Sequence, residues 1–162
     1  MAQEPRKSQK NEPFEEPPLA DIPGISRGHV AYLESTDEES AWFIAGMDHV
    51  VITTIGRKSG NEHKVALPVW FDDNGDRIVV ASYAGAPENP AWYLNLSDRD
   101  ANPEVRARVR GREFWADAQV LDGSDYAATW KALTEDREYY NDYQTRTERR
   151  IPLVRLVELR PV

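Results

Sequence analysis

The sequence contains no cysteine, and this absence removes several classes of protein at once. A chain without thiols can form no disulfide framework, no cysteine-bound zinc or iron–sulfur centre and no cysteine nucleophile. Long apolar runs are missing too, since no stretch approaches the roughly 18 residues that a membrane-spanning helix requires. We therefore expect a chain without stable membrane insertion.

Basic residues are few, because 20 Lys and Arg face 28 Asp and Glu, which gives a formal net charge of -8. Duplex nucleic acid requires a concentrated basic face, so we expect no nucleic-acid partner. The most basic stripe, Arg106, Arg108 and Arg110, is expected to be an outward strand face with partners within the chain. A small anionic ligand remains compatible with this charge, because a local basic cluster can hold a phosphate on an acidic protein.

The first 25 residues differ in composition from the rest of the chain. They hold five of the 11 prolines, carry more acidic than basic residues and show no apolar periodicity. This composition predicts a disordered or loosely draped, acidic, proline-rich arm over residues 1–25 and one domain over residues 26–162. The N-terminal residues also lack the apolar segment of a secretion signal, so we expect a cytoplasmic protein.

The hydrophobic pattern of the remaining chain predicts short strands mixed with helices. The expected strands cover residues 50–55, 62–71, 77–82, 105–110, 113–121 and 151–159, and the expected helices lie within 28–47 and over 91–96, 125–133 and 139–147. Pro68 indicates an edge or a bulge in its strand, and Ser124 is a plausible N-cap. The order of elements predicts a mainly β (α+β) fold, a small antiparallel barrel with packed helices.

Residues 54–60, with the sequence TIGRKSG, end a strand in a glycine-bounded turn. Arg57 and Lys58 supply two cations, Ser59 a hydroxyl and the backbone several N–H groups, which are the ingredients of an anion-binding nest. A solvated hairpin turn with solubilising cations explains the same pattern and is favoured on the pattern alone.

Two further segments combine small or aromatic residues with polar groups. The loop 81–90 and the helix after it place Trp92 and Asn95 on one face, where an aromatic wall and an amide can meet a planar ring. Trp92 equally suits a core position. Tyr140 and Tyr143 share a helical face, and their phenols either line a pocket and donate a proton or pack half-buried.

Taken together, these segments resemble the deazaflavin-dependent nitroreductase family over residues 27–159. The resemblance includes ANPEV at 101–105, DYQ at 142–144, Thr147, and Ile151 with Pro152. Members bind coenzyme F420 on a split β-barrel related to flavin reductases and pyridoxamine phosphate oxidases. The resemblance implies a split antiparallel β-barrel with packed helices, and a deazaflavin-binding domain over residues 26–162.

The resemblance also implies roles for individual residues. Arg57, Lys58 and Ser59 would hold the phosphate and acidic tail of the coenzyme. Tyr140 would contact the coenzyme and position the acceptor or donate a proton, with Ser82 as a second catalytic candidate, and Trp70 and Tyr143 would face the substrate. The remaining expected coenzyme contacts, which lie beneath and around the ring, are Lys64, Val65, Ala66, Leu67, Pro68, Val80, Ala81, Ser82, Tyr83, Ala91, Trp92 and Asn95.

The chain departs from the family pattern at several of its positions. Tyr83 stands where a lysine is common, Ala84 replaces a glycine, and Asn89 replaces a histidine. Arg137 takes a position that some members give to tyrosine. These departures imply one contact fewer to the coenzyme tail and an acceptor pocket unlike that of the nitroimidazole-reducing members.

The expected function is hydride transfer from reduced coenzyme F420 to a small-molecule acceptor, either unsaturated or nitro-bearing, as in a quinone, enone or nitro reductase. A non-catalytic F420-binding or storage protein is one alternative, and an FMN- or haem-binding barrel is another. The three histidines show no paired ligand spacing, so no metal site is expected. Related barrels often dimerise, which leaves a homodimer open.

Overall fold

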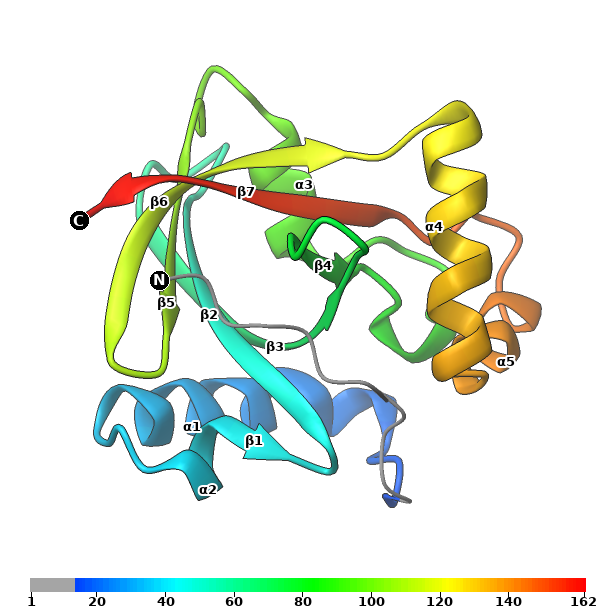
Figure 1. Cartoon of the computed structure of the whole chain (residues 1–162), viewed down its shortest axis with the longest axis horizontal. Helices are drawn as coiled ribbons and strands as arrows, with labels where there is room; N and C mark the ends of the chain where they lie inside the picture. The colour runs from blue at the N-terminus through cyan, green and yellow to red at the C-terminus, as the bar shows by residue number, and fades with distance from the viewer. Residues whose placement is uncertain (1–13) are drawn as a thin grey trace.

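The structure is a computed structural model that describes residues 14–162, and Figure 1 shows its arrangement. Within these residues the chain alternates short helices with antiparallel strands. The helices are the 3-10 helices η1 (Leu19–Asp21) and η2 (Tyr83–Gly85) and the α-helices α1 (Ile22–Glu34), α2 (Glu39–Trp42), α3 (Ala91–Ser97), α4 (Gly123–Asp136) and α5 (Tyr139–Thr145). The strands are β1 (Phe43–Ile44), β2 (Met47–Ile55), β3 (Glu62–Phe71), β4 (Arg77–Val80), β5 (Val105–Val109), β6 (Arg112–Val120) and β7 (Leu153–Pro161).

The strands form one antiparallel sheet that closes on itself. Their order is β1-β2-β3-β4-β7-β6-β5, and an additional pairing between β2 and β5 joins the two ends. Six strands therefore make the barrel, while β1 is a two-residue extension that pairs only with β2. The predicted mainly β, antiparallel barrel with packed helices is confirmed.

The interior of the barrel is filled by alternate residues of its strands. Val50 and Ile52 of β2 meet Ala107 of β5, and Trp92 and Leu96 of α3 pack against the same cluster. The alternation places every second side chain inside, because side chains along a strand point to opposite faces. Helix α3 thus closes the barrel with Trp92, which the sequence analysis predicted either as a wall of a ligand site or as a core residue.

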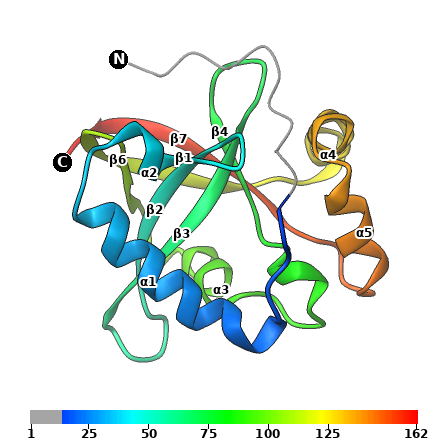
Figure 2. The same ribbon diagram turned by 90° about the horizontal axis from the view of Figure 1, so that it is seen from below.

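Two satellite cores attach the other helices to the outside of the barrel. Helices α1 and α2 pack Val30, Leu33 and Trp42 against Val51 on the outward face of β2, and Figure 2 shows α1 lying across β2 and β3. Helices α4 and α5 pack against a second cluster that includes Trp70 and Leu133. None of the helices in residues 14–162 has the length and apolar character needed to cross a bilayer.

The boundary predicted at residue 25 between the arm and the domain falls inside helix α1. Helix α1 begins at Ile22 and takes Pro23 into its first turn, a position where proline is tolerated because its missing N–H would have no helical partner. Upstream, the Phe14 ring meets the Tyr139 ring edge-on at 5.5 Å, and Glu16 pairs with Arg146 at 2.6 Å. The rest of the predicted arm, residues 1–13, lies outside the described residues.

Two local expectations also change. The N-cap of α4 is Asp122, whose side chain accepts a hydrogen bond from the Gly123 N–H at 2.7 Å, so the helix starts earlier than a Ser124 cap would allow. Pro68 pairs with His49 without a register shift, which rules out the bulge. The edge interpretation holds, because β4 pairs only with Trp70 and Phe71 and leaves this part of β3 with β2 alone.

Candidate active site

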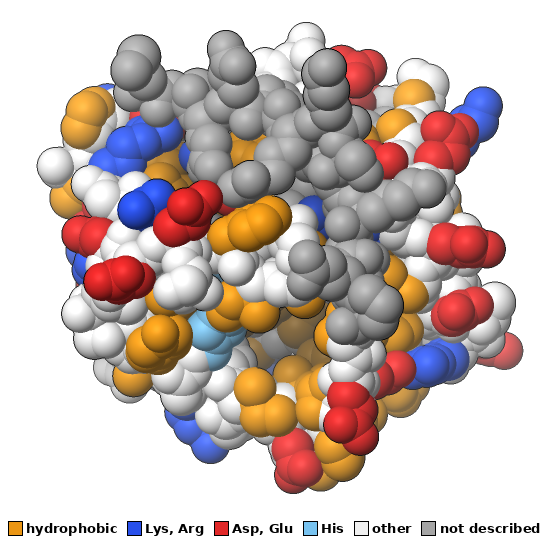
Figure 3. Space-filling view, turned by 60° about the horizontal axis from the view of Figure 1, so that its bottom comes forward, with side chains coloured by type: hydrophobic (Ala, Val, Ile, Leu, Met, Phe, Trp, Pro, Cys, Tyr) orange, Lys and Arg blue, Asp and Glu red, His pale blue; other side chains and the backbone are white. Residues whose placement is uncertain are grey.

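A cavity of about 820 Å³ opens beside the outer part of β3. On the face shown in Figure 3, hydrophobic side chains gather around a hollow. Segments far apart in the sequence enclose the cavity: the N-terminal part of α1, the turn after β2, β3, the loop after β4, the start of α3, and α5. Its volume suits a cofactor-sized ligand.

Nearly all of the predicted site residues line this one cavity. The structure brings together Arg57, Lys58, Ser59, Lys64, Val65, Ala66, Leu67, Pro68, Val80, Ser82, Tyr83, Ala91, Trp92, Asn95, Tyr140 and Tyr143. Cations and a hydroxyl gather at the turn, apolar side chains follow β3, and phenols come from α5. One cavity therefore combines anion-binding groups, an apolar floor and proton donors.

Two predicted residues lie outside the cavity. Trp70 shares the outward face of β3 with Ala66 and Pro68, but it lies where α4 covers the strand. Its indole Nε1–H donates to Asp136 Oδ2 at 2.9 Å, so Trp70 is engaged with α4 and does not line the cavity. Ala81 is fully buried, and its carbonyl accepts from Arg149 instead of facing a ligand.

The turn between β2 and β3 is compact because glycines stand at both of its ends. The Gly60 N–H donates to the Gly56 carbonyl at 2.9 Å, and Gly60 has a φ of 73°, a left-handed conformation that glycine adopts freely. A Cβ on Gly56 would lie 2.5 Å from Ser59 Oγ, so a side chain there would displace that hydroxyl. The glycines thus let Arg57, Lys58 and Ser59 face the cavity side by side.

Two buried asparagines attach this turn to the rest of the site. Asn102 accepts from the Ile55 N–H at 2.7 Å and donates to the carbonyls of Ile55 and Asn95, each at 2.8 Å. Asn95 Oδ1 accepts from the Arg57 backbone N–H at 3.3 Å and from its guanidinium at 2.8 Å. Asn95 therefore orients Arg57. The sequence had predicted only that Asn95 contacts the ring of the coenzyme.

The aromatic end of the cavity is built by α5 and the N-terminal segment. The ring of Tyr140 lies 4.4 Å from that of Tyr139 and 6.0 Å from that of Tyr143, measured between centroids. Burial raises the pKa of Tyr143 to about 12, and burial raises the pKa of Tyr139 further. Because both phenols stay protonated at neutral pH, this end of the cavity can donate protons but carries no phenolate charge.

Several lining residues were not predicted from the sequence. Phe14 packs on Tyr139, and the Tyr139 hydroxyl contacts Met47 Sδ at 3.6 Å. His49 also lines the cavity, and burial, followed by the nearby His29, lowers its pKa to about 4. No local pattern marks Phe14, Met47 or His49, because each reaches the cavity only through the packing of distant segments.

The loop after β4 adopts a left-handed conformation at consecutive residues. Tyr83, Ala84 and Gly85 have φ values of 45°, 51° and 78°. Arg149 holds this loop by donating to the carbonyls of Ala81, Ser82 and Ala86 and to Asn89 Oδ1, at 2.8 to 3.1 Å. Arg149, which was not predicted, thus keeps Ser82 and its neighbours at the cavity wall.

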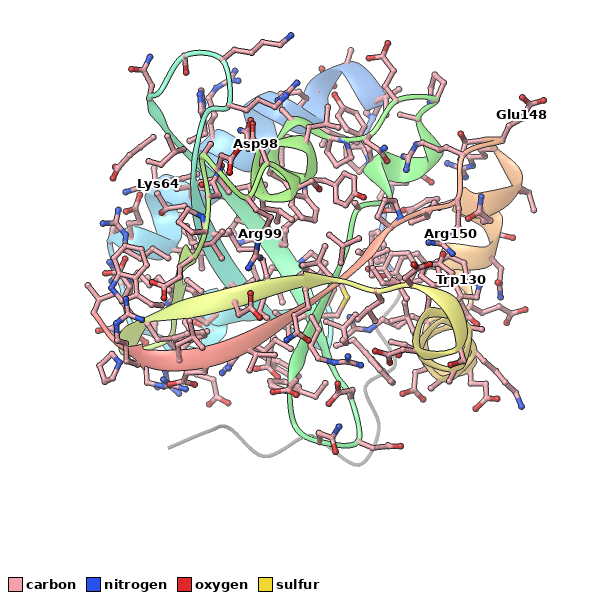
Figure 4. The ribbon with its side chains drawn as sticks, turned by 90° about the horizontal axis from the view of Figure 1, so that it is seen from above. Lys64, Asp98, Arg99, Trp130, Glu148 and Arg150 are labelled. Carbon is pink, nitrogen blue, oxygen red and sulfur yellow. The ribbon has the colours of Figure 1, made fainter. Side chains whose placement is uncertain are left out.

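The remaining charged clusters are engaged within the chain. Arg106 pairs with Glu62 and Glu113, Arg108 with Asp37, and Arg110 donates to the Asp37 carbonyl at 2.6 Å, so all three have partners within the chain. Trp130 of α4 and the nearby Arg150 lie across the molecule from Lys64 (Figure 4), and Arg150 stacks over Tyr126 of α4 at 4.0 Å. Nowhere in residues 14–162 do three His, Asp or Glu gather as a metal site.

A closed antiparallel barrel with a cationic turn, an apolar strand and a phenol cluster around one outer cavity defines a split-barrel protein that binds a planar coenzyme with an anionic tail. Known proteins agree with this class. The family model described as F420H(2)-dependent quinone reductase matches residues 25–158. An F420H(2)-dependent quinone reductase of Mycobacterium tuberculosis is 34% identical over 108 residues, covering 65% of this chain and 70% of that protein.

Solved structures extend the comparison. The structure of an F420-H2 dependent reductase (FDR-A) has a TM-score of 0.56 and 35% identity and covers 67% of this chain and 92% of that chain. A domain-swapped dimer has a TM-score of 0.59 and 30% identity and covers 80% of this chain and 95% of that one. A protein of unknown function from Agrobacterium tumefaciens, 12% identical with a TM-score of 0.52, shares the fold alone.

The chain belongs to the F420H(2)-dependent quinone reductase family. This assignment confirms the predicted coenzyme, F420, and hydride transfer from its reduced form to an acceptor. It also confirms the split barrel, and it does not favour a storage protein or an FMN- or haem-binding barrel. The match to this family does not confirm the predicted assignment to the nitroreductases.

Proposed function

We propose that this protein reduces a quinone with reduced coenzyme F420, holding the coenzyme along β3 and the quinone against the tyrosines of α5. The observation that carries the proposal is the single cavity in which Arg57 and Lys58, the apolar β3 segment and Tyr140 meet. These three parts of the cavity match three parts of the coenzyme, which has an anionic tail, a flat ring and a reacting edge.

The residues of the cavity fit the coenzyme group by group. The N–H groups and cations of Arg57 and Lys58, together with the Ser59 hydroxyl, offer donors for a phosphate and carboxylates. Val65, Leu67 and Trp92 are apolar and pack against the barrel core, so they present a firm surface to a planar ring. When bound, reduced F420 supplies the hydride.

The protein itself orients the reactants and handles the proton. A quinone that accepts a hydride needs one proton on an oxygen to become the hydroquinone. Tyr140, buried and lining the cavity, is proposed to donate a hydrogen bond to that oxygen and pass it the proton, which solvent then replaces. Ser82, whose hydroxyl makes no hydrogen bond with any residue in 14–162, is a second donor for the acceptor.

The first test is a titration that follows quenching of deazaflavin fluorescence by the protein. We expect micromolar or tighter binding, and a loss of at least tenfold when Arg57 and Lys58 are both changed to Ala. Lys131→Ala is the matched control, because this exposed lysine of α4 lies outside the cavity. No binding of F420 at micromolar protein would refute the proposal.

The second test separates binding from turnover. With a soluble naphthoquinone as acceptor, Tyr140→Phe should lower kcat at least tenfold and leave the affinity for the coenzyme almost unchanged. Tyr32→Phe, at an exposed position of α1, is the control. An enone and a nitroaromatic assayed beside the quinone will show whether either of these expected acceptors is used. An unchanged kcat in Tyr140→Phe would remove this residue from the reaction.

Two further predictions remain open. A homodimer is supported by the domain-swapped relative and is tested by the molecular mass in solution. The cytoplasmic location stays a prediction.

A further inference from the structure

Arg27 is a cation that lines the cavity from α1, while Arg57 and Lys58 line it from the turn after β2. The sequence predicted an anion site at the turn only. The surroundings of Arg27 therefore bear on how much of the coenzyme this protein contacts.

Most basic side chains of this acidic chain have a carboxylate partner. Ion pairs join Arg99 to Asp117, Arg106 to Glu62 and Glu113, Arg108 to Asp37, Arg112 to Glu158, Arg146 to Glu16, Arg150 to Asp122, Arg155 to Asp72 and Asp125, and Arg160 to Glu104. By contrast, the side chains of Arg27, Lys58, Arg77 and Lys131 form neither an ion pair nor a hydrogen bond with any residue in 14–162. Arg77 instead lies over the rings of Phe71 and Phe114, and of the other three, Arg27 and Lys58 line the cavity.

Helix α1 holds Arg27 on the side that faces the sheet. Val30, three residues later, is buried against the barrel, and Glu34, seven residues later, pairs with Lys64 of β3 at 2.7 Å. Residues three and seven apart share a helical face, so Arg27 lies on this face about 10 Å before Glu34 along the axis. The Glu34 pair anchors α1 to β3 and thereby limits how far Arg27 can move from the cavity.

The ion pair between Glu34 and Lys64 also reduces the number of cations that are free to bind a ligand. Glu34 neutralises Lys64, and Arg57 already donates to Asn95. Arg27 and Lys58 keep their full set of donors and reach the cavity from two different elements. An anion bound in this cavity can therefore meet two unpaired cations that come from two different elements, α1 and the turn after β2.

We propose that Arg27 and Lys58 form an anion clamp that binds the carboxylate-bearing tail of the coenzyme, so that α1 is part of the coenzyme site and the protein selects tailed over tail-free deazaflavins. This inference rests on the proposed function and adds to it a second element that recognises the tail. Each cation supplies charge-assisted hydrogen bonds, which are roughly twice as strong as neutral ones.

The test compares two probes on the full chain. One is coenzyme F420 with its phosphate and glutamate tail, and the other is the deazaflavin riboside, which lacks both. Arg27→Ala should weaken binding of F420 about tenfold and leave binding of the riboside unchanged. Arg27→Lys should retain most of the affinity because it keeps the charge, and Lys131→Ala should match the unchanged protein for both probes.

Two further measurements exclude a structural explanation. Affinity for F420 should fall less steeply with salt in Arg27→Ala, because one charge contact has been removed. The thermal midpoint of this variant should match that of the unchanged protein. An equal loss for both probes, or no loss for either, would overturn the clamp. If the unchanged protein binds neither probe, the proposed function fails with it, whereas normal F420 binding by Arg27→Ala refutes the clamp alone.

Discussion

Replacing Asn102 by Ala tests the idea that a buried amide holds the anion-binding turn in place. Asn102 is almost fully buried and makes three hydrogen bonds, one from the Ile55 N–H and two to the carbonyls of Ile55 and Asn95. The side chain lies between β2 and α3 and joins the two elements through these bonds. The substitution leaves an N–H and two carbonyls without their partner.

The magnitude follows from those contacts. At about 1 kcal/mol of net stability for each hydrogen bond, Asn102→Ala should lower the free energy of unfolding by about 3 kcal/mol. For a chain of this size that loss corresponds to a thermal midpoint lower by about 10 °C. Because Asn95 also orients Arg57, we expect a weaker affinity for coenzyme F420 in the folded protein.

The assay is urea unfolding, paired with the fluorescence titration below the unfolding transition. Asn102→Asp is the informative second variant, since it keeps the acceptor for the Ile55 N–H but turns a carboxylate toward two carbonyls. It should be at least as destabilised as the Ala variant. Asn141→Ala, at an exposed site on α5, should change stability by less than about 0.5 kcal/mol.

Two results would refute the reasoning. If Asn102→Asp is as stable as the unchanged protein, the two donated hydrogen bonds contribute nothing. If Asn102→Ala loses stability but binds F420 with unchanged affinity, the asparagine supports the fold without positioning the turn.

The remaining predictions concern the loop, the buried histidine and the reassigned tryptophan. Ala84→Gly should raise the free energy of unfolding by about 0.5–1 kcal/mol in urea, because Ala84 has a φ of 51°; an unchanged or lower value would argue against strain there. Burial lowers the pKa of His49 to about 4 in the folded protein. The stability that goes with its neutral form is therefore fully present above the unfolded pKa of 6.5 and is lost as the pH falls toward 4. Stability should therefore fall by about 2 kcal/mol more between pH 7 and pH 5 in the unchanged protein than in His49→Gln, and equal slopes would exclude the histidine. Trp70→Phe should cost about 1–2 kcal/mol through its lost hydrogen bond to Asp136, while F420 affinity stays the same; a weaker affinity would place Trp70 back in the site.

Local patterns were sufficient where a function depends on neighbouring residues. The turn 56–60 carries its cations, hydroxyl and glycines in one short segment, so the ingredients of an anion site were visible in the sequence, although only the family resemblance favoured that site over a solvated turn. The strand over residues 62–71 was predicted with the bounds that β3 has, because its ends are marked by the turn before it and the hairpin after it. The expectation that residues 64–68 contact the coenzyme came from the resemblance to the family, and in the structure these residues line the cavity.

Other residues could not be assigned without the packing. Trp70 lies two residues after Pro68 on the same face of β3, and only the position of α4 directs it to Asp136 and away from the cavity. Arg149 looks like an exposed loop cation in the sequence, yet it binds three carbonyls of a distant loop. Phe14 was expected in a disordered or loosely draped arm, and only the packing of distant segments shows that its ring lies against Tyr139.

The sequence by itself determined the class of this protein: an acidic, thiol-free antiparallel barrel with a cationic turn and a phenol-bearing helix, the parts of an F420-dependent reductase. These features are local, because strand period, turn glycines and residue chemistry are set within a few positions. Only the tertiary structure decided which cations remain unpaired, because ion pairs such as Glu34 with Lys64 join residues from distant segments. That decision identified Arg27, on α1, as a group that can bind the coenzyme.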